Sequence, residues 1–429
     1  MSASITAEEF IKMDAGDYYV IDLRDREAFD KDHIEGAYFF TPEEIQAFCD
    51  NAEKADGSKE ISGESSEGAM PELLKIVSSG RKIVVLCRFG RISADVVDEL
   101  RDAGYDAYNL EGGYGAYVYR LASGAAEDDE RRVSIEESIT KTFKKDLFSR
   151  FTKGIVNYEL VQPGDKIAVC ISGGKDSMCM AMLFKELQKH HKFPFEIVFL
   201  CMDPGYSEVN RKVIESNAKL MGIPLTIFDT NIFDAVYSVE KSPCYLCARM
   251  RRGYLYSKAK ELGCNKIALG HHFDDVIETV LMGMLYSGQF QAMMPKLHST
   301  NFEGMELIRP LYLVREDDIK RWRDYNGLHF IQCACHFTDT CTTCRPEGEG
   351  GSKRLAVKQL IAELKKTNPN VENNLLRSTE NIPFEKMLGI KINGEKHAFT
   401  EYYDVPQDEL ASYLNEQIGK HSGKKEDTV

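Results

Sequence analysis

Residues 166–180, KIAVCISGGKDSMCM, join an apolar run to a polar turn and a second apolar stretch. The run KIAVCIS has the length and composition of a buried strand, and the turn SGGKDS follows it directly. Successive glycines let backbone N–H groups approach an anion closely, and a helix that begins there adds a favourable dipole. The spacing is not the Walker A pattern G-x-x-x-x-G-K-[ST]. The stretch therefore predicts a phosphate-binding turn of another kind, with a plain tight turn capped by Asp176 or Ser177 as the alternative.

Three further apolar runs, in FEIVFLCMD, LTIFDT and NKIALGHHF, alternate with helical patterns. This alternation predicts a parallel sheet with helices on both faces. In such a sheet, ligands bind outside the carboxyl ends of the strands. Polar groups follow three of the predicted strands, in SGGKDS, MDPGYS and GHHFDD. We therefore expect a nucleotide site at this edge of the sheet.

Each candidate residue at that edge supplies a group that a nucleotide needs. Lys175 offers a positive charge and, with Asp176, is a candidate catalytic residue, while Asp203 is expected to fix the adenosine or a metal. The candidate nucleotide-binding residues are Ser172, Gly173, Gly174, Lys175, Ser177, Asp203, Gly270, His271, His272 and Asp275. The side chains of GHHFDD could hold Mg²⁺ or orient phosphates, and helix capping is the alternative for each, above all for Asp274.

Twelve cysteines in a large chain without a signal-peptide pattern indicate metal or thiol chemistry rather than disulfides. The stretch SPCYLCARMRRG places Cys244 and Cys247 at i and i+3, on one face of a starting helix. CACHFTDTCTTC could supply further ligands, so a zinc site and a 4Fe–4S cluster both remain open, beside two structural cysteines. The arginines that follow are expected either to contact phosphates or to form a solvated face; they are Arg249, Arg251 and Arg252.

The first 125 or so residues also alternate strand and helix patterns. Cys87 ends the apolar run KIVVLC and begins the loop CRFGRIS, which leads into an amphipathic helix. Backbone N–H groups of such a loop, with Arg88 and Arg91 nearby, favour an anionic sulfur. A buried strand-end cysteine is the alternative.

The formal net charge of −14 argues against extended nucleic-acid binding, although binding depends on local basic patches such as ARMRRGYLYSKAK. The 43% hydrophobic and 28% charged content is ordinary for a globular protein. No apolar run approaches the roughly 18 to 20 residues that span a bilayer. We therefore expect a cytoplasmic protein that does not bind a membrane.

SGGKDS is similar to the pyrophosphate-binding PP-loop of N-type ATP pyrophosphatases. With CYLCARMRRGYLY and KIALGHHFDD, the chain resembles the tRNA 2-thiocytidine synthetase family from about Ser134 to Lys365. The resemblance implies that ATP is cleaved to AMP and pyrophosphate, that AMP is attached to a base carbonyl oxygen, and that sulfur then displaces it.

The resemblance also implies a 4Fe–4S cluster held by the CxxC pair and one later cysteine, with one iron open to carry sulfide. HFIQCAC matches the position of the later ligand at Cys333. The chain departs from the simple pattern because it also offers Cys335, Cys341 and Cys344. The third ligand therefore stays open, as does a separate zinc site built from CTTC.

The N-terminal stretches VIDLRDREAFDKDHIEGA, LCRFGRISADVVDEL and NLEGGYGAY resemble a rhodanese domain over about residues 5–120. This resemblance implies that Cys87 carries a persulfide. Asp22, Arg24 and Glu111 are interpreted as scaffold contacts rather than catalysts.

The predicted fold is α/β: a rhodanese-like domain, then an adenine nucleotide alpha-hydrolase-like parallel-sheet domain with a helical C-terminal extension. The predicted bounds are 1–125 for the first domain, 126–133 for a linker, 134–370 for the second domain, and 371–429 for an extension with a disordered tail. The predicted activity is ATP-dependent thiolation of a cytidine in tRNA, with sulfur relayed from Cys87 through the cluster. The cofactors would be ATP, Mg²⁺ and the 4Fe–4S cluster, and the partners tRNA, a cysteine desulfurase as sulfur donor, and a second copy in a homodimer.

Two alternatives remain from the sequence. One is thiolation of another RNA position or of a small metabolite, and the other is a redox-sensing or sulfide-sensing protein that binds ATP.

Overall fold

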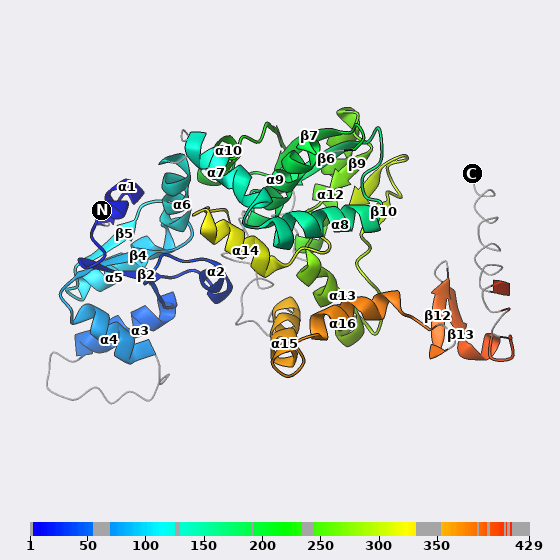
Figure 1. Cartoon of the computed structure of the whole chain (residues 1–429). Helices are drawn as coiled ribbons and strands as arrows, with labels where there is room; N and C mark the ends of the chain where they lie inside the picture. Colours follow the sequence, from blue (N-terminus) through cyan, green and yellow to red (C-terminus); the bar gives the residue numbers. More distant parts are fainter. Residues whose placement is uncertain are drawn as a thin grey trace.

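The structure is a computed structural model of the 429-residue chain. The residues that it describes are 3–54, 69–124, 129–190, 192–233, 243–331, 353–383, 386–392, 395–406, 409 and 412–413. They form an N-terminal α/β body, a larger α/β body and a C-terminal extension, coloured from blue through green to orange in Figure 1.

The N-terminal sheet has five parallel strands in the order β1-β5-β4-β2-β3. Its strands are β1 Ser4–Ile5, β2 Tyr18–Asp22, β3 Tyr38–Phe39, β4 Lys82–Leu86 and β5 Ala107–Leu110. Its helices are α1 Ala7–Ile11, α2 Arg26–Lys31, α3 Pro42–Lys54, α4 Ala69–Val77, α5 Ile92–Asp102 and α6 Gly113–Gly124. Helices lie on both sides of this sheet (Figure 1), so the central strand β4 is buried from its second residue onward. Cys87 follows β4 directly.

The second sheet has six strands in the order β10-β11-β9-β6-β7-β8, and every neighbouring pair is parallel except β10 and β11. Its strands are β6 Lys166–Ile171, β7 Glu196–Asp203, β8 Leu225–Asp229, β9 Lys266–Ala268, β10 Lys296–His298 and β11 Glu306–Ile308. The chain runs from β6 to β7 and β8 on one side, then returns to β9 and β11 on the other. The carboxyl end of β6 is therefore at the switch point where α/β sheets bind ligands. The predicted parallel sheet is confirmed.

Helices flank the second sheet and continue beyond it. They are α7 Asp129–Thr140, α8 Ser149–Asn157, α9 Lys175–Lys189, α10 Glu208–Leu220, α12 Pro243–Glu261, α13 Phe273–Ser287, α14 Glu316–Tyr325, α15 Lys353–Thr367 and α16 Val371–Glu380. A π-helical turn, Lys144–Phe148, joins α7 to α8. Helices α15 and α16 pack on α13. The extension also contains an antiparallel hairpin, β12 Gly389–Ile392 and β13 Glu395–Ala398, which sequence reasoning missed.

The two α/β bodies share a hydrophobic core. Helix α6 packs against α10, and Val118 of α6 belongs to the same buried cluster as Val213 of α10 and Phe330. Residues 126–133 were predicted as a linker, but from Asp129 onward the chain is already α7, whose Ile135 is buried in the shared core. The first body is therefore docked on the second through a packed interface.

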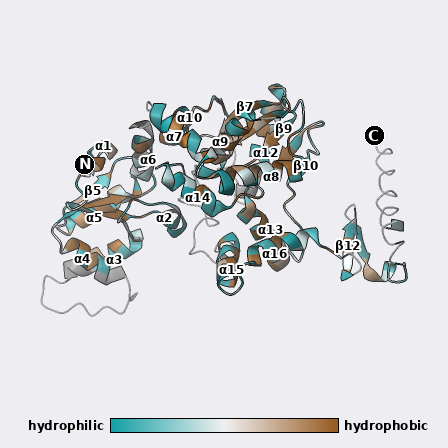
Figure 2. Ribbon diagram, in the orientation of Figure 1, coloured by the Kyte–Doolittle hydropathy of each residue, from teal (hydrophilic) through white to brown (hydrophobic). Residues whose placement is uncertain are grey.

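Apolar residues gather on the strands of both sheets, shown brown in Figure 2. None of the helices in the described part of the chain is long and apolar enough to cross a membrane. Residues 55–68 lie outside the described residues, as does the C-terminal end where the disordered tail is predicted.

Candidate functional site

The turn after β6 depends on two glycines. Gly173 has a φ of +82°, and a Cβ atom on it would lie 2.4 Å from Ile214 Cγ1 of α10. Backbone conformation and space therefore both exclude a side chain here. Gly174 is the N-cap of α9 and makes no side-chain cap, so orphan N–H groups of the first turn are left for an anion. This local geometry supports the predicted phosphate turn.

A cavity of about 520 Å³ opens at the carboxyl edge of β6 and its neighbours. This volume lies within the roughly 300–1,000 Å³ of small-molecule sites. Predicted residues line it from two strand ends: Ser172, Asp176, Ser177, Gly270 and His271. The rest of the polar wall comes from residues outside the predicted nucleotide set: Arg251, Arg252 and Arg309. The cavity is the candidate nucleotide site.

Lys175 does not line this cavity. Its ammonium lies 3.0 Å from Asp176 Oδ2 and 3.1 Å from Glu316 Oε1 of α14. Burial alone would lower the pKa of Lys175, but the charges of Asp176 and Glu316 outweigh it and raise the pKa. Lys175 is therefore charged and held by carboxylates, and its predicted contact with phosphates requires it to exchange partners.

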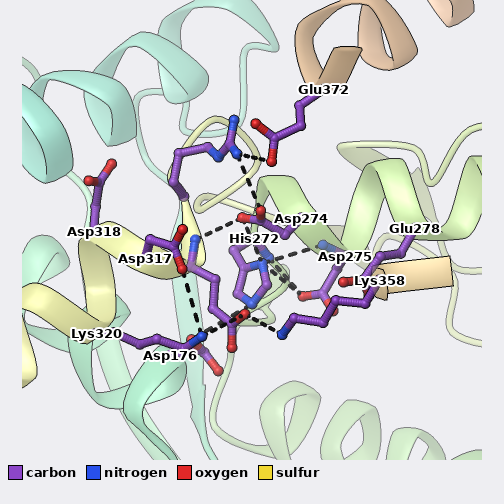
Figure 3. A network of polar contacts seen from close by, with 12 residues as sticks. Asp176, His272, Asp274, Asp275, Glu278, Asp317, Asp318, Lys320, Lys358 and Glu372 are labelled. Carbon is purple, nitrogen blue, oxygen red and sulfur yellow. Dashed lines mark hydrogen bonds and ion pairs between the residues drawn. The ribbon is translucent and has the colours of Figure 1, made fainter. Parts of the chain in front are cut away.

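Glu316 is the centre of this network, which sequence analysis did not identify. It is 7% exposed, and besides Lys175 it pairs with Lys358 of α15 at 2.7 Å and Lys320 at 3.3 Å. Burial alone would raise the pKa of Glu316, yet the surrounding lysines, Lys175 first, hold it well below its usual range. Figure 3 shows Lys320 and Lys358 converging on one point of the network from different elements. The phosphate turn is thus linked to the C-terminal helices.

The GHHFDD stretch opens α13 and joins the same network (Figure 3). His272 and Asp275 form a reciprocal cap, in which the backbone N–H of His272 donates to Asp275 Oδ2 at 3.0 Å and Asp275 N–H donates to His272 Nδ1 at 3.4 Å. Asp274 Oδ2 accepts the backbone N–H of Glu316 at 2.8 Å. Arg354 of α15 pairs with Asp275. The side chains of His272, Asp274 and Asp275 therefore all have partners within the protein. His272 and Asp275 cap α13, which is the alternative that the sequence left open for them.

Three side-chain atoms at the cavity are buried without a hydrogen-bond partner in the part of the chain that the structure describes: Asp176 Oδ1, His271 Nδ1 and Arg309 Nε. Burial, and next the charge of Arg309, lower the pKa of His271 to about 4. His271 is therefore neutral at pH 7. Buried polar atoms normally have partners, so this group indicates a polar ligand.

Asp203 ends β7 as predicted, but its carboxylate is used by the following turn. Oδ1 accepts N–H groups of Gly205 at 2.9 Å and Tyr206 at 2.7 Å, and Oδ2 pairs with Arg211 at 3.2 Å. Asp203 does not line the cavity, whereas its neighbour Met202 does. Its predicted contact with adenosine or a metal stays a prediction.

The CxxC pair lies in the first turns of α12, with Cys244 and Cys247 one turn apart. Cys247 is half-buried and packs on the small cluster that contains Met202, a residue of the cavity wall. Cys247 is therefore adjacent to the cavity. Cys333 and the other downstream cysteines lie outside the described residues. Within the described ranges no group of three or more His, Cys, Asp or Glu is arranged to hold a metal ion.

Cys87 is 4% exposed at the start of the loop after β4. Its Sγ accepts the N–H of Gly90 at 3.1 Å and that of Ser93 at 3.5 Å. The backbone of Gly113 packs closely against the loop, since a Cβ on this residue would lie 2.2 Å from the Cys87 carbonyl oxygen. The backbone N–H groups of the loop CRFGRIS therefore point at the sulfur atom. Nearby, Arg24 and Asp22 form a buried ion pair of 2.6 Å, which is a scaffold contact.

A small cavity of about 30 Å³ lies between the Cys87 loop and the second body. Arg88 and Tyr114 line it on one side, and Asn210, Phe330 and Ile331 on the other. A Cβ on Gly173 would also lie 2.8 Å from Ile331 Cδ1. The segment that ends at Ile331 is therefore packed between the Cys87 loop and the phosphate turn, and Cys333 follows it by two residues in sequence.

Arg309 and Glu316 are the main site residues that sequence reasoning missed. Arg309 follows β11 directly, and a polar residue at a strand end is the same signal that identified Asp203 at the end of β7. β11 has only three residues, of which only Leu307 and Ile308 are apolar, so no apolar run marked it as a strand.

Comparison with known proteins places both bodies in families. Residues 6–119 match the rhodanese-like domain and residues 137–337 match the PP-loop domain. A tRNA-cytidine(32) 2-sulfurtransferase of Delftia acidovorans is 32% identical over 297 residues, which are 68% of this chain and 90% of the relative. The enzyme of the same name from Geobacter sulfurreducens is 33% identical over 243 residues, 56% of this chain and 91% of the relative.

Two solved structures are also similar. The U34-tRNA thiolase NcsA from Methanococcus maripaludis, solved with its [4Fe-4S] cluster, has a TM-score of 0.45 at 22% identity, over 64% of this chain and 88% of its own. A rhodanese-like domain protein from Staphylococcus aureus has a TM-score of 0.19 at 22% identity, over 27% of this chain and 90% of its own. The family assignment rests on the sequence relatives.

Proposed function

The chain belongs to the tRNA-cytidine(32) 2-sulfurtransferase family, and from that premise we propose that it is an ATP-dependent enzyme that replaces the 2-carbonyl oxygen of a tRNA cytidine by sulfur. The cavity at the end of β6 carries this proposal, because it combines a glycine turn, three arginines and unpartnered polar atoms next to Cys247 of the CxxC pair. Its setting would be the cytoplasm, with tRNA as the acceptor.

Two bond exchanges make up the proposed reaction. The base carbonyl oxygen attacks the α-phosphorus of ATP, and the bond to pyrophosphate breaks. A sulfur nucleophile then attacks the ring carbon that bears this oxygen, and the carbon–oxygen bond breaks so that AMP leaves with the oxygen. Loop N–H groups at Gly174 and the Ser177 hydroxyl would bind the departing pyrophosphate, and Lys175 would join them when it leaves Glu316. Mg²⁺ would arrive with the phosphates of the nucleotide.

Cys244, Cys247 and Cys333 are the residues that would hold a 4Fe–4S cluster. Such a cluster, with three cysteine ligands, offers an iron with an open position for sulfide. The pair fits this role because it opens a helix at one-turn spacing, and because Cys247 packs on the cluster that contains Met202 of the cavity wall. We expect Cys244→Ala, Cys247→Ala and Cys333→Ala each to abolish iron–sulfur absorbance and thiolation while ATP binding survives. A Cys333→Ala protein with a full cluster would contradict the third assignment.

The N-terminal domain would supply the sulfur. A persulfide on Cys87 would be stabilised by the N–H groups of Gly90 and Ser93. Its outer sulfur would pass to the thiolation site, with two electrons from a thiol reductant, and Cys87 would return to the thiol. A cysteine desulfurase is the proposed upstream donor, and a homodimer remains a prediction.

The test uses the full-length protein, purified anaerobically, with tRNA and ATP. Nucleoside mass spectrometry should detect 2-thiocytidine, together with AMP and pyrophosphate that form only when tRNA is present. Formation of ADP, or absence of a thiolated nucleoside with every sulfur source, would contradict the proposal.

Cys87→Ser separates the two domains' roles in the same assay. It should carry no persulfide and should lose thiolation with thiosulfate or a protein donor. With excess inorganic sulfide it should retain activity, because the second body is unchanged. Equal activity of variant and wild type with every donor would exclude the relay.

A further inference from the structure

Arg309 is a cation built into the wall of the nucleotide cavity. It follows β11, and its backbone N–H donates to the Pro295 carbonyl at 2.9 Å. Its guanidinium also donates from Nη1 to the Met294 carbonyl. Two bonds to the chain preceding β10 thus hold the residue in place, while its buried Nε is left without a partner.

Arg309 has no carboxylate partner among the described residues, unlike Arg315 and Arg354 of the adjoining network. Arg315 pairs with Glu372, and Arg354 with Asp275. Across the described residues no ion pair involves Arg309, and its buried Nε has no acceptor. A buried cation without a counter-ion is costly, so a site of this kind is built for an anion that arrives with a ligand.

The neighbour of Arg309 in the wall supports this reading. His271 also lines the cavity, has an unpartnered Nδ1, and is neutral at pH 7. A neutral imidazole adds hydrogen-bonding capacity without a second charge. The ligand at this end therefore needs negative charge to balance the guanidinium of Arg309, and a phosphodiester or monoester group supplies it.

The position of Arg309 separates this anion from the one at the phosphate turn. β9 lies between β11 and β6 in the sheet. With strands about 4.8 Å apart, the end of β11 is about 10 Å from the turn after β6. The turn amides and Arg309 therefore face different phosphates of one ligand.

We propose that Arg309 binds the α-phosphate of the nucleotide, the phosphate that stays with AMP when pyrophosphate leaves the turn. This inference rests on the proposed use of ATP. It makes Arg309 a catalytic residue, since a guanidinium on the α-phosphate oxygens stabilises the charge that they carry while the base attacks.

Calorimetric binding of AMP, pyrophosphate and adenosine to the full-length protein without tRNA tests the inference. Arg309→Gln should weaken AMP binding at least tenfold, which corresponds to about 1.4 kcal/mol. Pyrophosphate and adenosine should bind within about twofold of wild type. Arg309→Lys keeps the charge but loses the planar donor pair, so its affinity for AMP should lie between those of the wild type and Arg309→Gln. Arg377→Gln, an exposed arginine of α16, is the matched control and should bind all three ligands normally.

Ser177→Ala gives the reciprocal result if the two phosphate sites are separate, with weaker pyrophosphate binding and unchanged AMP binding. Wild-type AMP affinity in Arg309→Gln would overturn the inference. It would also be overturned if AMP binding were unchanged while tRNA binding fell, because Arg309 would then contact RNA phosphate. Equal losses for all three ligands would show a distorted cavity and count against it as well. None of these outcomes uses thiolation, so they leave the test of the proposed function separate.

Discussion

Gly173 combines two constraints that can be measured separately. Gly173→Ala puts a side chain at a φ of +82° and 2.4 Å from Ile214 Cγ1. We expect the free energy of unfolding to fall by about 2–3 kcal/mol, from backbone strain and overpacking together. ATP affinity should fall by at least about tenfold, since the amides of the turn move. Chemical denaturation and calorimetry measure the two effects.

Gly164→Ala is the control, because Gly164 has the same φ of +82° with no atom within 4 Å of an added Cβ. It should lose only about 1 kcal/mol and bind ATP normally. Equal losses in the two variants would show that space around Gly173 is irrelevant.

His271 makes a prediction about pH. Its pKa is about 4 in the folded protein, against 6.5 as the ordinary value, because of burial and then Arg309. The unfolded chain therefore takes up a proton between these values while the folded protein does not, so the stability contribution is full above about pH 6.5 and is lost as pH falls toward 4. Relative to His271→Gln, the wild type should lose at most about 2 kcal/mol between pH 7 and pH 5. Parallel stability curves of wild type and variant would contradict this shift.

Sequence reasoning at this scale found residues whose role follows from backbone position. Ser172, Gly173 and Gly174 follow an apolar run, and the structure places them at the turn. The orientation of Lys175 could not be predicted, because it depends on Glu316, which is 141 positions away in the sequence. Arg309 was not predicted as a site residue because the short strand before it was not recognised.

Helix α15 is the element that connects the phosphate turn to the C-terminal extension, through the bond from Lys358 to Glu316. Lys358→Met should leave Glu316 to pair more strongly with Lys175, so ATP affinity should fall about threefold, or roughly 0.6 kcal/mol. The free energy of unfolding should fall by about 1 kcal/mol or less, since the Lys358 side chain is 46% exposed and water screens the pair. Calorimetry and denaturation measure both.

Lys366→Met on the same helix is the control for this change. Lys366 pairs with Glu363 at the surface, with side-chain exposures of 68% and 66%. Its removal should alter neither quantity measurably. A threefold loss of ATP affinity in Lys366→Met would attribute the effect to α15 itself rather than to Glu316.

Long apolar runs determined which elements could be predicted. β4, β6 and β7 have five, six and eight residues and were all expected from composition. β10 and β11 have three residues each, too few for periodicity to show. The hairpin of β12 and β13 was missed for a different reason, since GIKI and EKHA lack a consistent alternation of apolar and polar residues.

At the scale of the whole molecule, two domains could be predicted because each carries its own motifs. Their docking could not, because the linker's acidic composition says nothing about whether two folded surfaces are complementary. Those surfaces are buried against each other in the structure, where Val118, Val213 and Phe330 share one cluster. Part of the predicted linker 126–133 is helical, since α7 begins at Asp129.

Docking gives the last prediction, because it determines whether sulfur from Cys87 reaches the second body directly. Gly115 lies on α6 where a Cβ would come 3.4 Å from Val209 Cγ1 of α10. Gly115→Leu should wedge the two helices apart, yet leave the N-terminal domain folded because leucine favours a helix more than glycine does. Persulfide loading of Cys87 from thiosulfate and sulfide-supported thiolation should both stay normal. Thiosulfate-driven thiolation should fall about fivefold or more, as the effective concentration of the donor drops.

Gly16→Leu, where an added Cβ atom meets nothing within 4 Å, is the control in the same domain and should keep wild-type thiosulfate-driven thiolation. Normal thiosulfate-driven thiolation in Gly115→Leu would mean that the docked arrangement is not the one that transfers sulfur. Transfer would then require the Cys87 loop to leave α10 and approach the cavity from another side, and cross-linking α6 to α10 would inhibit the enzyme instead of supporting it. The sign of the cross-linking effect therefore distinguishes transfer in the docked arrangement from transfer after undocking.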